Sequence, residues 1–258
     1  MSVLKMDNVV MKFGGVIAAN NLNIEVEKGK IVALIGPNGA GKTTAFNVVT
    51  GVYNPTSGNV YLNDEKITGL SPDKITNKGI ARTFQNIRLF SELTVLDNIL
   101  IANHLQVKSD FISCALRMPW AKKEENAMRE KSEMLLNKLG LLHLKNEISS
   151  SLPYGEQRKL EIARALATDA KLLLLDEPAA GMNPHETNEL TNFIHTIRDE
   201  FGLTVFMIEH HMDLVMEISD KIYVLDFGQL IAEGTADEIK NNPRVIEAYL
   251  GVEEDAEN

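Results

Sequence analysis

A glycine-rich stretch with one lysine and two threonines offers the first chemistry in this sequence. It occupies residues 36–44 and follows Ile31–Ile35, a short apolar run typical of a strand that is buried on both faces. Glycines let successive backbone N–H groups turn inward around phosphate oxygens, and a helix that begins within residues 41–50 adds the favourable field of its N-terminus. The residues that we expect to bind a nucleotide's phosphates are Gly36, Asn38, Gly39, Ala40, Gly41, Lys42, Thr43 and Thr44. Lys42 is suited to bridge phosphate oxygens, and Thr43 to ligate Mg²⁺.

Two adjacent carboxylates follow a second apolar run, at residues 172–175. Asp176 is suited to hold Mg²⁺ through its water shell, and Glu177 can orient or deprotonate an attacking water. A glutamate at this point favours hydrolysis over transfer to a second substrate. The alternative is a pair of acids at a strand end that only accept backbone N–H groups.

The elements that must position these groups alternate in type. Further apolar runs at residues 204–208 and 222–225 are separated by helical patterns such as residues 186–200, which indicates a mostly parallel sheet covered on both sides. Leu22, Ile24 and Val26 alternate with polar residues, as in an antiparallel strand. Between about residues 86 and 150 the strand signal disappears, and residues 121–139 predict a charged amphipathic helix, preceded by Trp120, which we expect to pack. The sequence therefore predicts an α/β fold with an N-terminal antiparallel β-subdomain and an inserted α-helical subdomain, and the phosphate loop makes the core resemble that of a P-loop NTPase (RecA-like).

Composition excludes some classes of protein. The net charge of −10 disfavours nucleic-acid binding, which depends on clustered Lys and Arg. The only cysteine, Cys114, suits a reducing compartment and a small buried residue. Lys5 and Asp7 interrupt any secretory signal, and no apolar run approaches the roughly 20 residues that span a bilayer. A membrane role would therefore be peripheral, and we expect the acidic residues 253–257 to form a disordered tail.

The order of the motifs identifies a family. A phosphate loop, a glutamine, a helix start that contains a glycine, an Asp-Glu pair and a histidine together resemble the ABC-transporter ATPases along nearly the whole chain. The resemblance implies ATP and Mg²⁺ as ligands and a single domain over residues 1–258. We expect a nucleotide-binding core at 1–85 and 155–235, a helical subdomain at 86–154, and C-terminal helices with an acidic tail at 236–258.

The resemblance also assigns residues to roles. Gln85 matches the family's Q-loop glutamine, which reaches Mg²⁺, and His210 matches the switch histidine that contacts the γ-phosphate, although His211 beside it is a second candidate. Phe13 resembles the aromatic residue that stacks on adenine; its alternative role is packing in a hairpin core. Asn183 stands where the family's D-loop usually has an aspartate.

The sequence LPYGEQR at residues 152–158 occupies the place of the ABC signature. In the family this segment contacts the γ-phosphate of ATP held by a partner subunit, which implies a head-to-tail dimer, of identical or paralogous chains, with Gly155 and Glu156 at the nucleotide. Pro153 and Tyr154 replace the usual serine and first glycine. A serine contact is therefore missing, while the backbone donors near Gly155 remain.

Residues 82–90, the Pro-Tyr form of the signature and residues 245–251 resemble the ATPases of branched-chain amino-acid importers. That likeness implies transmembrane permease partners, an indirect link to a solute-binding protein, no nucleic acid, and a cytoplasmic position on the inner face of the cell membrane. Residues 86–90 are a candidate docking groove for a permease helix, with ordinary packing as the alternative. Three rival functions are the ATPase of a lipopolysaccharide exporter, a soluble ABC ATPase of cofactor assembly, and a scaffold that binds ATP without turnover.

Overall fold

The computed structural model describes residues 1–103 and 118–256, with side chains described as far as Tyr249. The chain forms two compact units, one from Met1–Gln85 and Lys171–Asn258 and the other from Asn86–Ala170. The second unit extends past residue 154, where the sequence analysis ended the helical insertion. It does so because helix α6 (Tyr154–Leu166) packs on α3 (Val95–Asn103).

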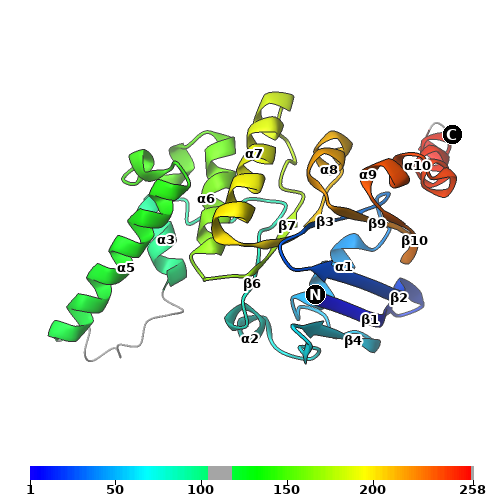
Figure 1. Cartoon of the computed structure of the whole chain (residues 1–258), viewed down its shortest axis with the longest axis horizontal. Helices are drawn as coiled ribbons and strands as arrows, with labels where there is room; N and C mark the ends of the chain where they lie inside the picture. The colour runs from blue at the N-terminus through cyan, green and yellow to red at the C-terminus, as the bar shows by residue number, and fades with distance from the viewer. Residues whose placement is uncertain (104–117, 257–258) are drawn as a thin grey trace. The chain divides into compact units, whose positions relative to one another are not determined.

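The first unit contains a six-stranded sheet in the order β10-β9-β3-β8-β7-β6 (Figure 1). Its strands are β3 (Ile31–Ile35), β6 (Ile80–Arg82), β7 (Leu172–Asp176), β8 (Thr204–Ile208), β9 (Lys221–Asp226) and β10 (Gln229–Gly234). All pairs are parallel except β9 with β10. Every residue of β3, β7 and β8 is buried, so the prediction of strands covered on both faces is confirmed.

An antiparallel sheet in the order β2-β1-β4-β5 completes the β structure of this unit. Its strands are β1 (Ser2–Phe13), β2 (Val16–Glu27), β4 (Ser57–Leu62) and β5 (Glu65–Lys66). On β2, Leu22, Ile24 and Val26 are fully buried between exposed neighbours. The predicted alternation is therefore confirmed.

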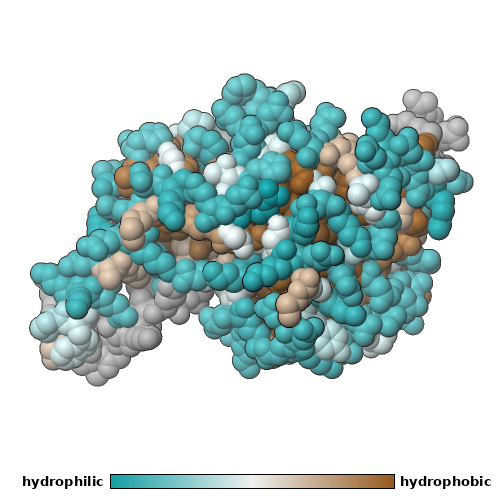
Figure 2. All heavy atoms as spheres, viewed as in Figure 1, coloured by the Kyte–Doolittle hydropathy of each residue, from teal (hydrophilic) through white to brown (hydrophobic). Residues whose placement is uncertain are grey.

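The helices of the first unit cover the sheets. They are α1 (Lys42–Val49), α2 (Pro72–Asn77), α7 (Pro184–Phe201), α8 (Met212–Ile218), α9 (Ala236–Lys240) and α10 (Pro243–Ala256). Helix α7 buries Leu190, Ile194 and Ile197, whereas the residues that it shows to the viewer in Figure 2 are mainly hydrophilic. It begins with a capping box, in which Asn183 accepts from the backbone N–H of Glu186. The asparagine that departs from the family pattern thus starts this helix.

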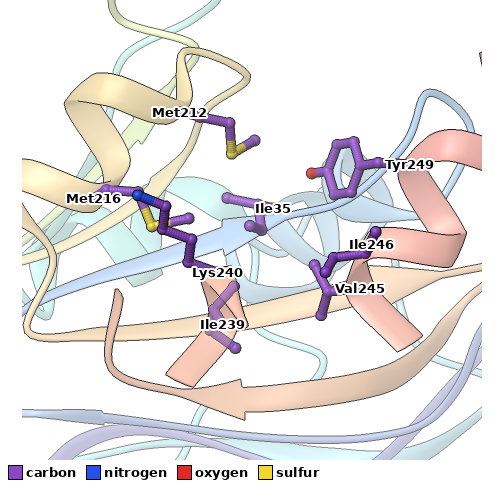
Figure 3. Close-up of a pocket in the computed structure, with 8 residues that line it drawn as sticks. All are labelled: Ile35, Met212, Met216, Ile239, Lys240, Val245, Ile246 and Tyr249. Atoms are coloured by element: carbon purple, nitrogen blue, oxygen red, sulfur yellow. The ribbon is translucent and has the colours of Figure 1, made fainter. Parts of the chain in front are cut away.

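Helices α8, α9 and α10 line an open, mainly apolar pocket of about 260 Å³ beside the end of β3 (Figure 3). Met212, Val245 and Ile246 line it, and burial raises the pKa of Tyr249, which also lines it, to about 12. Helix α10 continues through Ala256, so the expectation of a disordered tail is wrong for residues 253–256. A helix can continue there because no glycine or proline follows Gly251.

The second unit is helical, with α5 (Pro119–Lys138) and the short 3₁₀ turns η2 (Leu142–Leu144) and η3 (Ser149–Ser151) beside α3 and α6. Trp120 is 58% exposed, so the expectation that it packs is wrong. It stands in the first turn of α5, where the buried position is the next residue, Ala121. Cys114 lies outside the described residues. Within the described ranges, we find no helix with the length and apolar character needed to cross a bilayer.

Candidate functional site

The carboxyl ends of three parallel strands meet at one edge of the six-stranded sheet. Leu34 on β3 pairs with Ile208 on β8, and Ile208 in turn lies beside Asp176 on β7. The residues that follow these strands are therefore neighbours, although up to about 170 positions separate them in the chain. The glycine-rich loop, the two carboxylates and the histidine pair all come from this edge.

The phosphate loop fits its surroundings only because glycines stand at its two ends. A Cβ atom on Gly36 would lie 2.1 Å from the carbonyl oxygen of Leu225, and one on Gly41 would lie 2.3 Å from that of Ala18. Gly41 also has φ +101°, a left-handed conformation that side chains disfavour. The loop backbone is thus fixed against β2 and β9 immediately before α1 begins.

Lys42 opens α1 and is only 6% exposed. Its Nζ donates to the carbonyl oxygens of Gly36 at 2.6 Å and Pro37 at 2.9 Å. Burial lowers the pKa of its ammonium group, and the nearby Glu177 carboxylate offsets part of that effect. A cation with so little hydration, held at the rim of a loop of amides, is suited to an anion such as a phosphate.

The other predicted residues of the loop differ in exposure. Asn38, Gly39 and Thr43 are exposed, Thr44 is half-buried, and Ala40 is buried, with its carbonyl oxygen accepting from the N–H of Gly228 at 2.9 Å. The Thr43 hydroxyl is thus open to a ligand at the start of α1.

Asp176 is the last residue of β7 and is 6% exposed. Its Oδ2 lies 2.7 Å from Nη2 of Arg82, which donates through Nη1 to Asn47 at 2.7 Å and to Thr50 at 3.2 Å. Arg82 was not among the predicted site residues, although it stands three residues before Gln85. The only signal for it was that a carboxylate at the end of a buried strand needs a cation or donors nearby.

Glu177 turns the chain out of β7 in a left-handed conformation, with φ +48°. Its Oε2 accepts from Nε2 of Gln85 at 2.7 Å, and its Oε1 lies 2.7 Å from Nε2 of His210. The three residues predicted as catalytic therefore form one hydrogen-bonded group. Such strain in a charged residue at a strand end is common where a side chain must be aimed at a ligand.

The oxygen atoms near the loop suit a hard cation. Thr43 contributes a hydroxyl, Asp176 a carboxylate and Gln85 a side-chain amide, and oxygen ligands of these kinds are those that Mg²⁺ prefers. The residues present therefore fit the magnesium ion that the sequence analysis expected with a nucleotide.

Phe13 is the last residue of β1 and is 42% exposed. Its ring meets the ring of Tyr53 edge to face, with centroids 5.2 Å apart. Tyr53 thus supports this ring while much of its surface stays in solvent, which is compatible with stacking against a flat ligand.

Gly155 and Glu156 belong to the second unit, in the first turn of α6. The helix begins at Tyr154 after Pro153, which makes no side-chain cap hydrogen bond. Glu156 lies 3.0 Å from Lys159 on the same helix. Further along, Arg158 and Glu161 form an ion pair at 2.7 Å that is almost fully buried. An N-terminus without a side-chain cap offers backbone donors to an anion.

Residues 86–90, the predicted docking groove, are tied to this helix, since the backbone N–H of Arg88 donates to Glu161 at 3.1 Å. Within these residues, Ile87 and Leu89 are half-buried and Phe90 is exposed.

Glu209, like Arg82, was not among the predicted site residues. It follows β8 directly and is fully buried. An acidic residue at the end of an apolar strand was the available signal.

Comparisons with known proteins agree with this geometry. The family model for ABC transporters matches residues 19–180, and a model for the branched-chain amino acid ATP-binding cassette transporter matches residues 229–255. The high-affinity branched-chain amino acid transport ATP-binding protein LivG of Escherichia coli is 47% identical over 96% of this chain and 98% of its own length. BraF of Pseudomonas aeruginosa, with the same description, is 45% identical over 96% of this chain and 98% of its own length. A crystal structure of the ADP conformation of an ATP-binding cassette of an ABC transporter has a TM-score of 0.85 and 35% identity, covering 97% of this chain and 99% of that one.

Proposed function

This chain belongs to the ATP-binding proteins of ABC transporters, and we propose that it hydrolyses ATP to drive the import of branched-chain amino acids. The observation that carries the proposal is the group around Glu177, whose carboxylate lies between Gln85 and His210 at the edge that holds the phosphate loop. The names of relatives almost half identical along the whole chain support the choice of solute.

Different residues of the chain have separate roles in the proposed reaction. The amides of the phosphate loop and Lys42 bind the β- and γ-phosphates, and Phe13 stacks on the adenine. Glu177 orients the attacking water and accepts its proton, and His210 holds the γ-phosphate in line with that water. A bound Mg²⁺ would neutralise charge on the phosphates, held by Thr43, Asp176 and Gln85.

We propose further that two such subunits act head to tail, each presenting Gly155 and Glu156 to the ATP of the other. The second subunit is an identical chain or a paralogue. Residues 86–90 would contact transmembrane permease subunits, which link the ATPase to a solute-binding protein, so the chain would be peripheral on the cytoplasmic face of the cell membrane. Two observations support this arrangement: Phe90 is exposed, and the backbone N–H of Arg88 donates to Glu161 on α6, the helix that begins in the signature segment.

Two variants test the hydrolytic function. We expect Lys42→Ala to abolish measurable binding of Mg-ATP, because the loop loses its cation. Glu177→Gln should keep Mg-ATP affinity within about threefold and lower kcat by at least about 100-fold, since general-base catalysis typically contributes that much. With ATP it should also run as a dimer in gel filtration. A Glu177→Gln protein that turns over ATP at the parent rate would refute the assigned role.

The transport function needs the protein's partners. We expect two hydrophobic permeases and a second ATP-binding subunit to co-purify with the tagged chain from detergent-solubilised membranes. Vesicles that contain this complex should take up leucine in the presence of ATP and a solute-binding protein. Recovery of only water-soluble partners would favour the cofactor-assembly alternative instead.

A further inference from the structure

A fully buried carboxylate stands directly behind the group of three residues around Glu177. Glu209 follows the last residue of β8 and has an exposed fraction of 0%. Removing a carboxylate from water is unfavourable unless hydrogen bonds or an opposite charge compensate it. We therefore expect hydrogen-bond donors or a positive charge next to the Glu209 carboxylate.

The partners of Glu209 come from two different loops. Its Oε1 accepts from the backbone N–H of Ala179 at 2.7 Å, in the loop that follows Glu177. Its Oε2 accepts from the backbone N–H groups of His210 at 2.8 Å and His211 at 3.1 Å, and the Nδ1 atom of His211 lies 3.2 Å away. Hydrogen bonds to a charged acceptor are about twice as strong as neutral ones. One side chain thus joins the loop after β7 to the loop after β8.

The same two loops carry the residues that meet at the site. The backbone N–H of Glu177 donates to the carbonyl oxygen of Ile208 at 2.9 Å, which fixes the start of both loops. Beyond that point, the carboxylate of Glu209 is one side chain that connects them, and the contact between Nε2 of His210 and Oε1 of Glu177, at 2.7 Å, is another. A shift of either loop would separate this pair.

We infer that Glu209 is a positioning residue, which keeps His210 against Glu177 by joining the backbone at Ala179 to the backbone at His210 and His211. The inference rests on the proposed roles of Glu177 and His210 in ATP hydrolysis. Because Glu209 is fully buried and its carboxylate accepts from backbone N–H groups, its effect on catalysis would pass through His210. A displacement of about 1 Å at a reacting group can lower a rate by about 100-fold, so such a link has a measurable effect.

A double-mutant cycle tests this role. In Glu209→Gln one oxygen becomes an NH₂ group, which faces backbone donors and breaks the contact with one of the two loops. We expect it to lower the kcat of the full chain about tenfold while the KM for ATP changes less than twofold. His210→Ala should lower kcat by itself, and adding Glu209→Gln to it should lower kcat less than twofold further. Thr191→Val, which removes a buried hydroxyl bonded to Thr187 on α7, is the control for a generic buried polar change and should leave both constants unchanged.

Each other outcome overturns the inference in a distinguishable way. If Glu209→Gln lowers kcat by the same factor with and without His210, it acts independently of that residue. If it weakens ATP binding and lowers kcat together, Glu209 only supports the fold of the site. If His210→Ala leaves kcat unchanged, the proposed role of His210 fails and this inference fails with it. Should Glu209→Gln not fold, Glu209→Asp, which keeps the charge but reaches only one loop, replaces it under the same criteria.

Discussion

Two glycines, one in each unit of the molecule, have opposite surroundings. Gly41 in the phosphate loop has φ +101°, and an added Cβ would lie 2.3 Å from the backbone oxygen of Ala18. Gly155 in the first turn of α6 has an ordinary helical backbone, and among the described residues nothing lies within 4 Å of an added Cβ. The chain's own fold requires a glycine at the first position but not at the second.

The difference bears on the proposal that both units take part in binding ATP. In the first unit the predicted site residues already have hydrogen-bond partners within the same unit. Lys42 donates to carbonyl oxygens of the loop, Asp176 pairs with Arg82, and Glu177 contacts Gln85 and His210. A glycine in a helix costs roughly 0.5–1 kcal/mol relative to alanine, so Gly155 lowers the stability of its own helix. Open space at Gly155 leaves room for a group from outside its own unit, which agrees with the proposal that this helix receives a partner's phosphate.

The largest effect should come from giving Gly41 a side chain. Gly41→Ala combines a left-handed backbone with a collision against Ala18, so we expect the free energy of unfolding to fall by roughly 2–5 kcal/mol. ATP affinity should fall at least about 100-fold, because amides of the loop leave their positions. Denaturant unfolding and calorimetry with Mg-ATP measure the two quantities.

Gly39→Ala is the matched control for Gly41→Ala. Gly39 also has a positive φ, +81°, but no atom lies within 4 Å of an added Cβ. We therefore expect it to lose only the backbone contribution, roughly 1–2 kcal/mol of stability. Equal losses for the two variants would show that the close approach to Ala18 has no importance.

An intermediate effect should come from Gly155→Ala. Because the added methyl group meets open space within the chain, stability should stay equal or rise by about 0.5–1 kcal/mol, and ATP affinity should change less than twofold. Hydrolysis at saturating ATP should nevertheless fall by about tenfold to 100-fold, since the methyl group would push a partner's phosphate away from the amides of α6. Steady-state ATPase rates and thermal unfolding decide this point.

Ser150→Ala, on the neighbouring turn η3, controls for a small change in the same unit and should leave hydrolysis unaffected. If Gly155→Ala turned over ATP at the parent rate, the proposal that Gly155 leaves room for a partner's phosphate would be wrong. Only the role of Gly41 in the fold of its own chain would then remain.

Much of the first unit could be predicted from the sequence because its signals are local. The continuous apolar runs that became β3, β7 and β8 need no knowledge of the rest of the chain, and the phosphate loop has its pattern within nine residues. Gln85, Glu177 and His210 could be placed at one site because they follow parallel strands of one sheet and match a family pattern.

Partners between distant segments could not be predicted in the same way. Arg82 and Asp176 are 94 positions apart, and nothing local indicates which of the chain's many cations would meet that carboxylate. Glu209 bonds to backbone N–H groups, which every residue other than proline carries, so no residue type identifies its partners. The prediction that Trp120 packs was wrong for another reason: the first turn of a helix has no preceding turn to show which face is buried.

The smallest effect, at Phe13, separates nucleotide binding from catalysis. The ring is supported by Tyr53 on one side and remains 42% exposed, so truncation should leave the hairpin folded. Stacking of a base on an aromatic ring contributes about 1–3 kcal/mol, and the lower value predicts that Phe13→Ala raises the Kd for ATP about fivefold, with kcat at saturation unchanged within twofold. Tripolyphosphate, which has no base, provides the control: its affinity for the phosphate loop should be the same in the parent and the variant. Equal weakening for both ligands would mean that Phe13 supports the hairpin next to the loop and does not contact adenine.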